Sequence, residues 1–113
     1  MTNPESCKSI EEIREAIDGI DYQILKLFSE RYGFVKAIVK FKTDEASVIA
    51  ENRQKEVIEK RREWATELGL NPDLFEEIFW TLMHYNVKKE LEILKNANAN
   101  PVQITSQKIK HNV

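Results

Sequence analysis

The chain has 113 residues, of which 42% are hydrophobic and 32% are charged. This balance is typical of one small folded domain and differs from that of disordered or membrane chains. Seventeen basic and nineteen acidic residues give a net charge of -2 and a pI near 5.8. No global positive field therefore attracts nucleic acid or anionic lipid, and any anion site must be local.

Several kinds of site lack the residues they need. Cys7 is the only cysteine, so a disulfide within the chain and a thiolate zinc site are excluded. His84 and His111 have no metal-ligand spacing, and three scattered glycines form no phosphate-binding loop. The first ten residues hold no export-type apolar run, and no stretch reaches transmembrane length. We expect a cytoplasmic protein without metal, cofactor, nucleic-acid partner or membrane partner.

A long first helix is predicted from Ser9 to about Lys42. Ser9 and Glu12 have the spacing of a capping box, which satisfies free N–H groups at a helix start. Apolar residues then recur at alternating steps of three and four, the pattern of a heptad seam. The seam positions are Ile10, Ile13, Ile17, Ile20, Ile24, Leu27, Arg31, Phe34, Ile38 and Phe41. Such a helix spans roughly 50 Å, whereas a domain of this size has a radius of gyration of about 13 Å, so a partner chain should cover the rest.

Two further helices are predicted after a loop at residues 43–51. The first carries Val57, Trp64, Ala65 and Leu68 and ends at Gly69, a residue that favours helix termination. Asn71, Pro72 and Asp73 provide the cap, first-turn proline and first-turn acid of the next helix. We expect an all-α protomer of three helices, with residues 1–8 as an N-terminal arm, 9–95 as the helical domain and 96–113 as a flexible tail.

Polar residues interrupt the apolar faces at Arg31, Asn86 and Glu90. Each has a simple structural explanation: Arg31 can set the register or extend to water, Asn86 can be a satisfied interior amide, and Glu90 can pair with a cation. Arg31 and Lys42 are eleven residues apart, about 16 Å along one side of a continuous helix. Arg14 lies about 25 Å from Arg31, so one site can use both only if a second chain runs antiparallel alongside.

Taken together, these cations and one carboxyl on apolar faces favour a buried site for a small polyanion, because arginine binds carboxylates in bidentate fashion. No activated nucleophile or metal set accompanies them. A reaction within the substrate, which needs only restraint and charge stabilisation, suits such a site.

Six segments in order carry a family resemblance: PESC, IREAIDGID, ERYGFVKAIVKFK, ASVIAENR, WATELGL and IFWTLMHYNVKKE. Over nearly all of residues 5–95 the chain resembles the all-helical chorismate mutase family, and it is most similar to the isochorismate pyruvate lyase branch. The resemblance implies an intertwined homodimer of three-helix protomers, with two active sites that are each completed by the partner's long helix. The substrate would be a small dicarboxylate.

The resemblance also assigns roles to residues. Arg14 is donated across the dimer, and Arg31 and Arg53 bind the substrate carboxylates. Lys42 hydrogen-bonds the ether oxygen of the enolpyruvyl group, where negative charge develops as the C–O bond breaks. Glu90 stands where the family usually has Gln, so it must be protonated to donate the second hydrogen bond to that oxygen.

Positions 50 and 54 are acidic in typical mutases, where they bind the ring hydroxyl. Ala50 is more similar to the lyase branch, whereas Gln54 can still accept a hydrogen bond. Asn86, on the same helix face as Glu90, is a further substrate-binding candidate. We expect a pericyclic enzyme with chorismate mutase activity and isochorismate pyruvate lyase activity. The alternative is a non-catalytic helical module for dimerisation or for regulatory metabolite binding.

Overall fold

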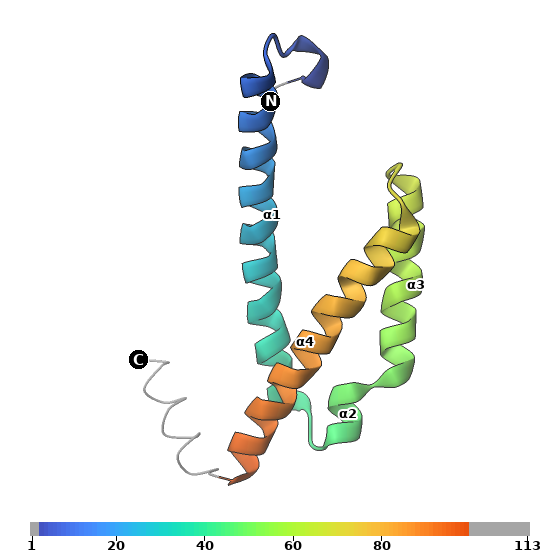
Figure 1. Cartoon of the computed structure of the whole chain (residues 1–113). Coiled ribbons are helices and arrows are strands. Elements are labelled where there is room, and N and C mark those ends of the chain that lie inside the picture. Colours follow the sequence, from blue (N-terminus) through green and yellow to red (C-terminus); the bar gives the residue numbers. More distant parts are fainter. Residues whose placement is uncertain (1–2, 100–113) are drawn as a thin grey trace. The chain divides into compact units, whose positions relative to one another are not determined.

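The computed structural model describes residues 3–99, which form helices and no strand (Figure 1). The elements are η1 (Pro4–Ser6), α1 (Ile10–Ile38), η2 (Val39–Phe41), α2 (Glu45–Ile49), α3 (Glu51–Glu67) and α4 (Pro72–Ala99). The chain divides into two compact units, whose boundary falls within α1 between Phe34 and Val35. The predicted all-α class and long N-terminal helix are confirmed.

The predicted start of α1 is confirmed. Ser9 Oγ accepts a hydrogen bond from the Glu12 backbone N–H at 3.2 Å. The Glu12 carboxylate in turn accepts from the Lys8 backbone N–H at 2.9 Å. Side chains therefore satisfy the N–H groups that a helix start leaves without partners.

The predicted end of this helix is wrong. α1 stops at Ile38, and η2 follows as a single 3-10 turn. Lys42 then has extended backbone, with φ -101° and ψ 138°. Because Val39 is buried against Val48 and Leu94, packing in the second unit ends the helix where no proline or glycine marks a break. The expected separation of about 16 Å between Arg31 and Lys42 along one continuous helix therefore does not apply.

The seam of α1 lies largely open in the single chain. Its exposed fractions are 55% for Ile10, 43% for Ile13, 49% for Ile17, 57% for Ile20, 42% for Ile24 and 62% for Leu27. Apolar side chains of this size are normally buried, so a continuous exposed stripe of them is unusual for a protein surface.

The loop predicted at residues 43–51 is also wrong, because α2 lies within it. Asp44 Oδ1 accepts from the Ser47 backbone N–H at 2.8 Å, and Ser47 Oγ accepts from the Asp44 backbone N–H at 3.3 Å. This capping box starts a helix of five residues, too short to show apolar periodicity in the sequence. Ala50, in the left-handed conformation with φ 42° and ψ 62°, separates α2 from α3.

The predicted stop at Gly69 is confirmed. Gly69 has φ 75°, a left-handed conformation that glycine adopts without steric cost. The Leu70 N–H donates to Ala65 O at 2.8 Å and the Gly69 N–H donates to Thr66 O at 3.1 Å. These two bonds form a Schellman motif, after which the chain reverses so that α3 and α4 lie side by side (Figure 1).

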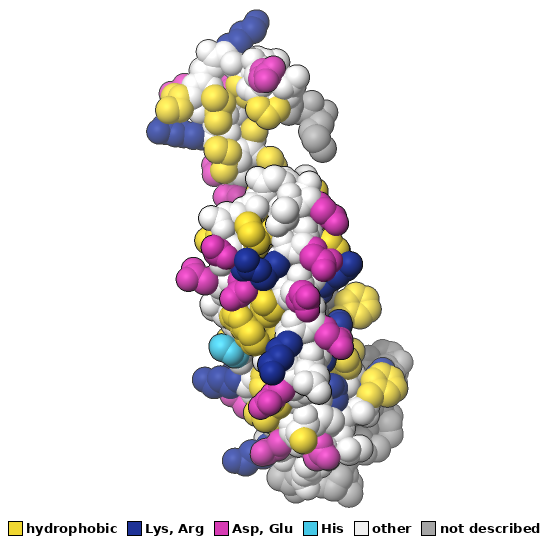
Figure 2. Space-filling model, turned by 90° about the vertical axis from the view of Figure 1, so that its right-hand side faces the viewer, with side chains coloured by type: hydrophobic (Ala, Val, Ile, Leu, Met, Phe, Trp, Pro, Cys, Tyr) yellow, Lys and Arg dark blue, Asp and Glu magenta, His cyan; other side chains and the backbone are white. Residues whose placement is uncertain are grey.

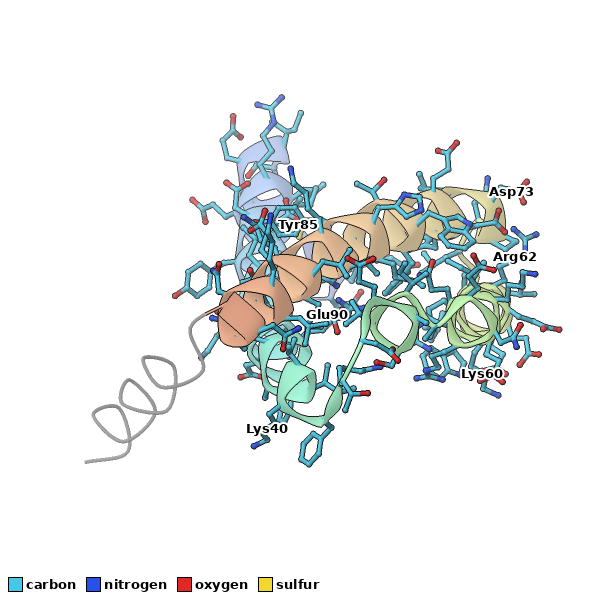
Figure 3. The ribbon with its side chains drawn as sticks, turned by 90° about the horizontal axis from the view of Figure 1, so that it is seen from below. Lys40, Lys60, Arg62, Asp73, Tyr85 and Glu90 are labelled. Atoms are coloured by element: carbon cyan, nitrogen blue, oxygen red, sulfur yellow. The ribbon has the colours of Figure 1, made fainter. Side chains whose placement is uncertain are left out.

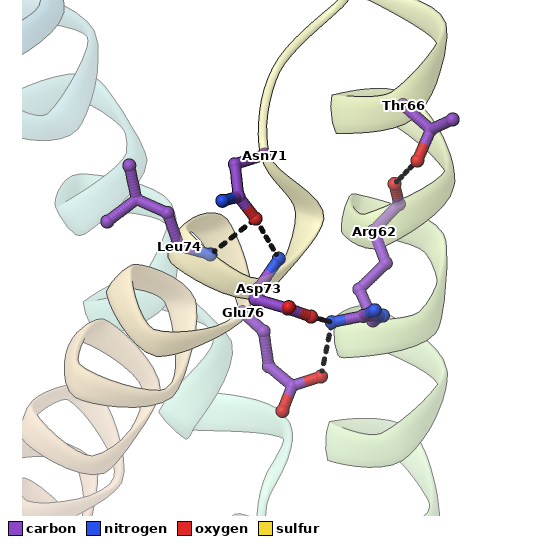
Figure 4. A network of polar contacts seen from close by, with 6 residues as sticks. All are labelled: Arg62, Thr66, Asn71, Asp73, Leu74 and Glu76. Carbon is purple, nitrogen blue, oxygen red and sulfur yellow. Dashed lines mark hydrogen bonds and ion pairs between the residues drawn. The ribbon is translucent and has the colours of Figure 1, made fainter.

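The predicted restart at Asn71 is confirmed as well. Asn71 Oδ1 accepts from the Asp73 N–H at 2.9 Å and from the Leu74 N–H at 3.4 Å (Figure 4). Arg62 of α3 reaches across to Asp73 at 2.9 Å and to Glu76 at 3.1 Å. This ion-pair cluster joins the two helices beside the turn.

The second unit has a small core in two clusters, both built on α4. One consists of Val39, Val48 and Leu94, and the other of Val57, Ile58 and Met83. α4 continues to Ala99, so residues 96–99, predicted as the start of a tail, are helical. The remainder of the predicted tail, residues 100–113, lies outside the described residues.

Candidate functional site

The predicted site residues fall into both units. Arg14 and Arg31 belong to the first unit, and Lys42, Arg53, Gln54, Asn86 and Glu90 belong to the second. Within the second unit, the structure brings the Lys42 ammonium close enough to Glu90 for electrostatic interaction. These two ionisable groups define the centre of the candidate site.

Lys42 is held by the end of α2. Its Nζ donates to the backbone carbonyl of Ser47 at 2.6 Å. That carbonyl lies in the last turn of the helix, where carbonyl groups have no intrahelical partner and carry partial negative charge. The lysine is half-buried, so its side chain is fixed between α2 and α4.

Glu90 and Asn86 form a buried polar pair one turn apart on α4. Glu90 is 8% exposed and Asn86 is 7% exposed. Figure 3 shows Glu90 on the face of α4 that turns toward the segment between η2 and α3. Two buried polar side chains on one face of a helix are suited to binding a polar ligand.

Two opposing effects act on the Glu90 carboxyl. Burial raises its pKa because desolvation disfavours the charged form, and the Lys42 ammonium lowers it. The effect of burial is the larger, so the pKa of Glu90 lies above the ordinary value for glutamate. The protonated form, which can donate a hydrogen bond, is therefore favoured relative to a solvent-exposed glutamate.

Gln54 is fixed at the joint between α2 and α3. Its Nε2 donates to the backbone carbonyl of Ile49, which leaves Oε1 as an acceptor. Ala50 presents only a methyl group at this joint. The pair therefore supplies one neutral acceptor and no carboxylate.

The three arginines have different surroundings. Arg53 extends to the surface, where it approaches Glu56 at 3.8 Å with side chains 66% and 71% exposed. Arg31 is half-buried, and burial lowers the pKa of its guanidinium. Arg14 is exposed on α1. Arg53 and Arg14 are thus free to reorient toward a ligand, whereas Arg31 is partly enclosed.

Asp44 and Ser47 were not among the predicted site residues, although they support Lys42. The sequence does contain the signal, because an N-cap residue followed three positions later by a hydroxyl or carboxyl residue is a capping-box spacing. A helix of one turn gives no second signal such as apolar periodicity, so the capping-box spacing alone does not predict α2.

Between residues 3 and 99, no group of three potential metal ligands occurs, and no helix is long and apolar enough to cross a bilayer. His84 is exposed. Figure 2 shows one face of the molecule. Basic and acidic side chains alternate over the face shown, without the continuous basic stripe typical of nucleic-acid binding.

Known proteins resemble this chain over most of its length. The model of the family "Chorismate mutase type II" matches residues 13–91. A protein of Pseudomonas aeruginosa named isochorismate pyruvate lyase is 35% identical over 92 residues, covering 81% of this chain and 91% of that protein. A protein of Methanocaldococcus jannaschii named chorismate mutase is 30% identical over 95 residues, covering 80% and 96% respectively.

Proposed function

Because the chain belongs to the type II chorismate mutase family, we propose that it catalyses two pericyclic reactions at one site. The first is the rearrangement of chorismate to prephenate, and the second is the elimination of pyruvate from isochorismate to leave salicylate. Both reactions break the same ether C–O bond and require the same restraint of the substrate. The names of the two relatives support one reaction each.

Lys42 is the proposed donor to the ether oxygen. Its ammonium lies within electrostatic range of Glu90, and this juxtaposition of a half-buried cation and a buried carboxyl is the observation that carries the proposal. A million-fold acceleration requires roughly 8 kcal/mol of transition-state stabilisation, of which one such donor contributes about 3 to 4 kcal/mol. Restraint of the substrate by bound carboxylates supplies the remainder.

Glu90 is the proposed second donor, in its protonated form. Burial supports this role because it raises the pKa of the carboxyl. Asn86, buried one turn earlier, is placed to bind another polar group of the substrate. Gln54 offers its carbonyl oxygen to the ring hydroxyl, and the absence of a carboxylate at Ala50 is consistent with lyase chemistry.

The substrate carboxylates are assigned to Arg31 and Arg53, with Arg14 supplied by a second copy of the chain. The open apolar seam of α1 supports a homodimer, since a second α1 has the matching heptad stripe to cover it. Arg14 and Arg31 are about 25 Å apart within one helix. In an antiparallel pair, however, Arg14 of the partner's α1 would lie near Arg31 of the first chain. The proposed assembly is an intertwined homodimer in the cytoplasm.

Parallel assays with chorismate and isochorismate test the proposal. Loss of chorismate absorbance reports the mutase reaction, and salicylate fluorescence reports the lyase reaction. Efficient salicylate formation would identify the lyase reaction as the main one, and prephenate alone would identify a mutase. Turnover of neither substrate would favour the alternative, a non-catalytic module for dimerisation or metabolite binding.

A further inference from the structure

The last turn of α2 binds two residues of the proposed site. A helix leaves its final carbonyl groups without intrahelical partners. In α2 the Ser47 carbonyl accepts from Lys42 Nζ at 2.6 Å, and the Ile49 carbonyl accepts from Gln54 Nε2. This five-residue helix therefore holds both side chains in place through its backbone.

α2 is itself fixed at its start and in its middle. Asp44 and Ser47 share three hydrogen bonds: the Ser47 N–H to Asp44 Oδ1 at 2.8 Å, Ser47 Oγ to Asp44 O at 2.8 Å, and the Asp44 N–H to Ser47 Oγ at 3.3 Å. Val48 is only 4% exposed and packs against Leu94 of α4. The orientation of the Ser47 carbonyl relative to α4 is thus set by the capping box together with one core contact.

We propose that Asp44 is a positioning residue for Lys42. Its side chain fixes Ser47, and the Ser47 carbonyl holds the Lys42 ammonium within electrostatic range of Glu90. One N–H of the ammonium is used in this bond, and two remain for the substrate. The inference rests on the proposed role of Lys42 as the donor to the ether oxygen.

Loss of the cap should change turnover more than substrate binding. Without the Asp44 acceptor, the first turn of α2 frays and the Ser47 carbonyl no longer has one orientation. Lys42 then samples other rotamers. Its hydrogen bond to the ether oxygen strengthens only as negative charge develops on that oxygen in the transition state. The carboxylate contacts of the arginines are unaffected, so kcat falls while KM is retained.

Three substitutions of Asp44 separate capping from charge. Asp44→Asn keeps the capping oxygen and loses the charge, whereas Asp44→Glu keeps the charge on a side chain that caps poorly. We expect kcat to fall about tenfold in Asp44→Ala and Asp44→Glu, with KM changed less than about twofold. Asp44→Asn should stay within about twofold of the wild type in both constants.

Asn71→Ala is the matched control, because it removes the N-cap of α4 at the opposite end of the second unit. It should lower the melting temperature as Asp44→Ala does, without lowering kcat. An equal loss of kcat in this control would overturn the inference, since the effect would then follow stability alone. If Asp44→Ala does not fold, the comparison of Asp44→Asn with Asp44→Glu decides.

Lys42→Ala, measured alongside, distinguishes a failure of the positioning inference from a failure of the proposed role of Lys42. If it loses turnover while Asp44→Ala does not, the positioning inference fails and the proposed function stands. If Lys42→Ala retains most turnover, the proposed role of the lysine fails. An active Asp44→Glu with an impaired Asp44→Asn would show that the charge acts instead of the cap, which would also overturn the inference.

Discussion

Replacing Glu90 with glutamine should remove the pH dependence that a buried carboxyl imposes on turnover. Only the protonated carboxyl can donate a hydrogen bond to the ether oxygen. Burial raises the pKa of Glu90 despite the nearby Lys42 ammonium. Above that pKa the protonated fraction falls about tenfold per pH unit, and kcat should fall with it. A glutamine amide donates at every pH, so the Glu90→Gln profile should be flat.

The same raised pKa has a consequence for stability, with a definite sign. The folded protein binds the Glu90 proton more tightly than the unfolded chain, so the folded state holds more protons between the unfolded pKa, about 4.3, and the folded pKa. Stability from this group is therefore present at low pH and falls as pH rises through that window. Glu90→Gln should raise the free energy of unfolding relative to the wild type, increasingly so toward neutral pH.

Steady-state kinetics with chorismate from acid to alkaline pH measure the effect on kcat. Denaturant unfolding at the two ends of that range measures the effect on the free energy of unfolding. Glu92→Gln is the matched control, because Glu92 lies on α4 with its side chain 51% exposed and pairs with Lys89 at 3.3 Å. Its kcat profile should follow the wild type. A Glu90→Gln profile that keeps the wild-type slope would refute the assignment of the protonated carboxyl as donor.

Three further changes test other parts of the structure. Lys42→Ala should lower kcat by about 10²- to 10³-fold while circular dichroism shows a folded helical protein. Retention of most activity would contradict the role of Lys42 as donor to the ether oxygen. Leu27→Lys, on the seam, should dissociate the proposed dimer in analytical ultracentrifugation, whereas Leu25→Lys, similarly exposed but off the seam, should not. Gly69→Ala forces a side chain into a left-handed conformation and should lower the free energy of unfolding by about 1 to 2 kcal/mol in denaturant titration; an unchanged midpoint would contradict this.

Helix ends with local chemical signals could be predicted from the sequence. The cap at Ser9, the stop at Gly69 and the restart at Asn71 each depend on residues within one turn, and the structure has the hydrogen bonds that the patterns require. The end of α1 could not be predicted in this way. It depends on the burial of Val39 against residues far along the chain, which local sequence does not encode.

Part of the candidate site could also be predicted from the sequence. Asn86 and Glu90 stand out because they interrupt an apolar face, and both prove to be buried. The balance between burial and the Lys42 charge at Glu90 required coordinates, since the two effects oppose each other and depend on distance. The support of Lys42 by α2 also required them, because its acceptor is a backbone carbonyl and not a side chain.

The interruption after Ile38 is what makes this arrangement of Lys42 possible. In a helix continued through Lys42, the backbone N–H of each residue bonds four residues back, and the lysine side chain leans toward the preceding turn. The structure instead ends the helix, turns once through η2 and extends at Lys42. The side chain can then bond forward to Ser47, five residues later, and meet the buried face of α4. We therefore expect that a substitution which extends α1 would withdraw Lys42 from Glu90, even though every proposed site residue remained in the sequence.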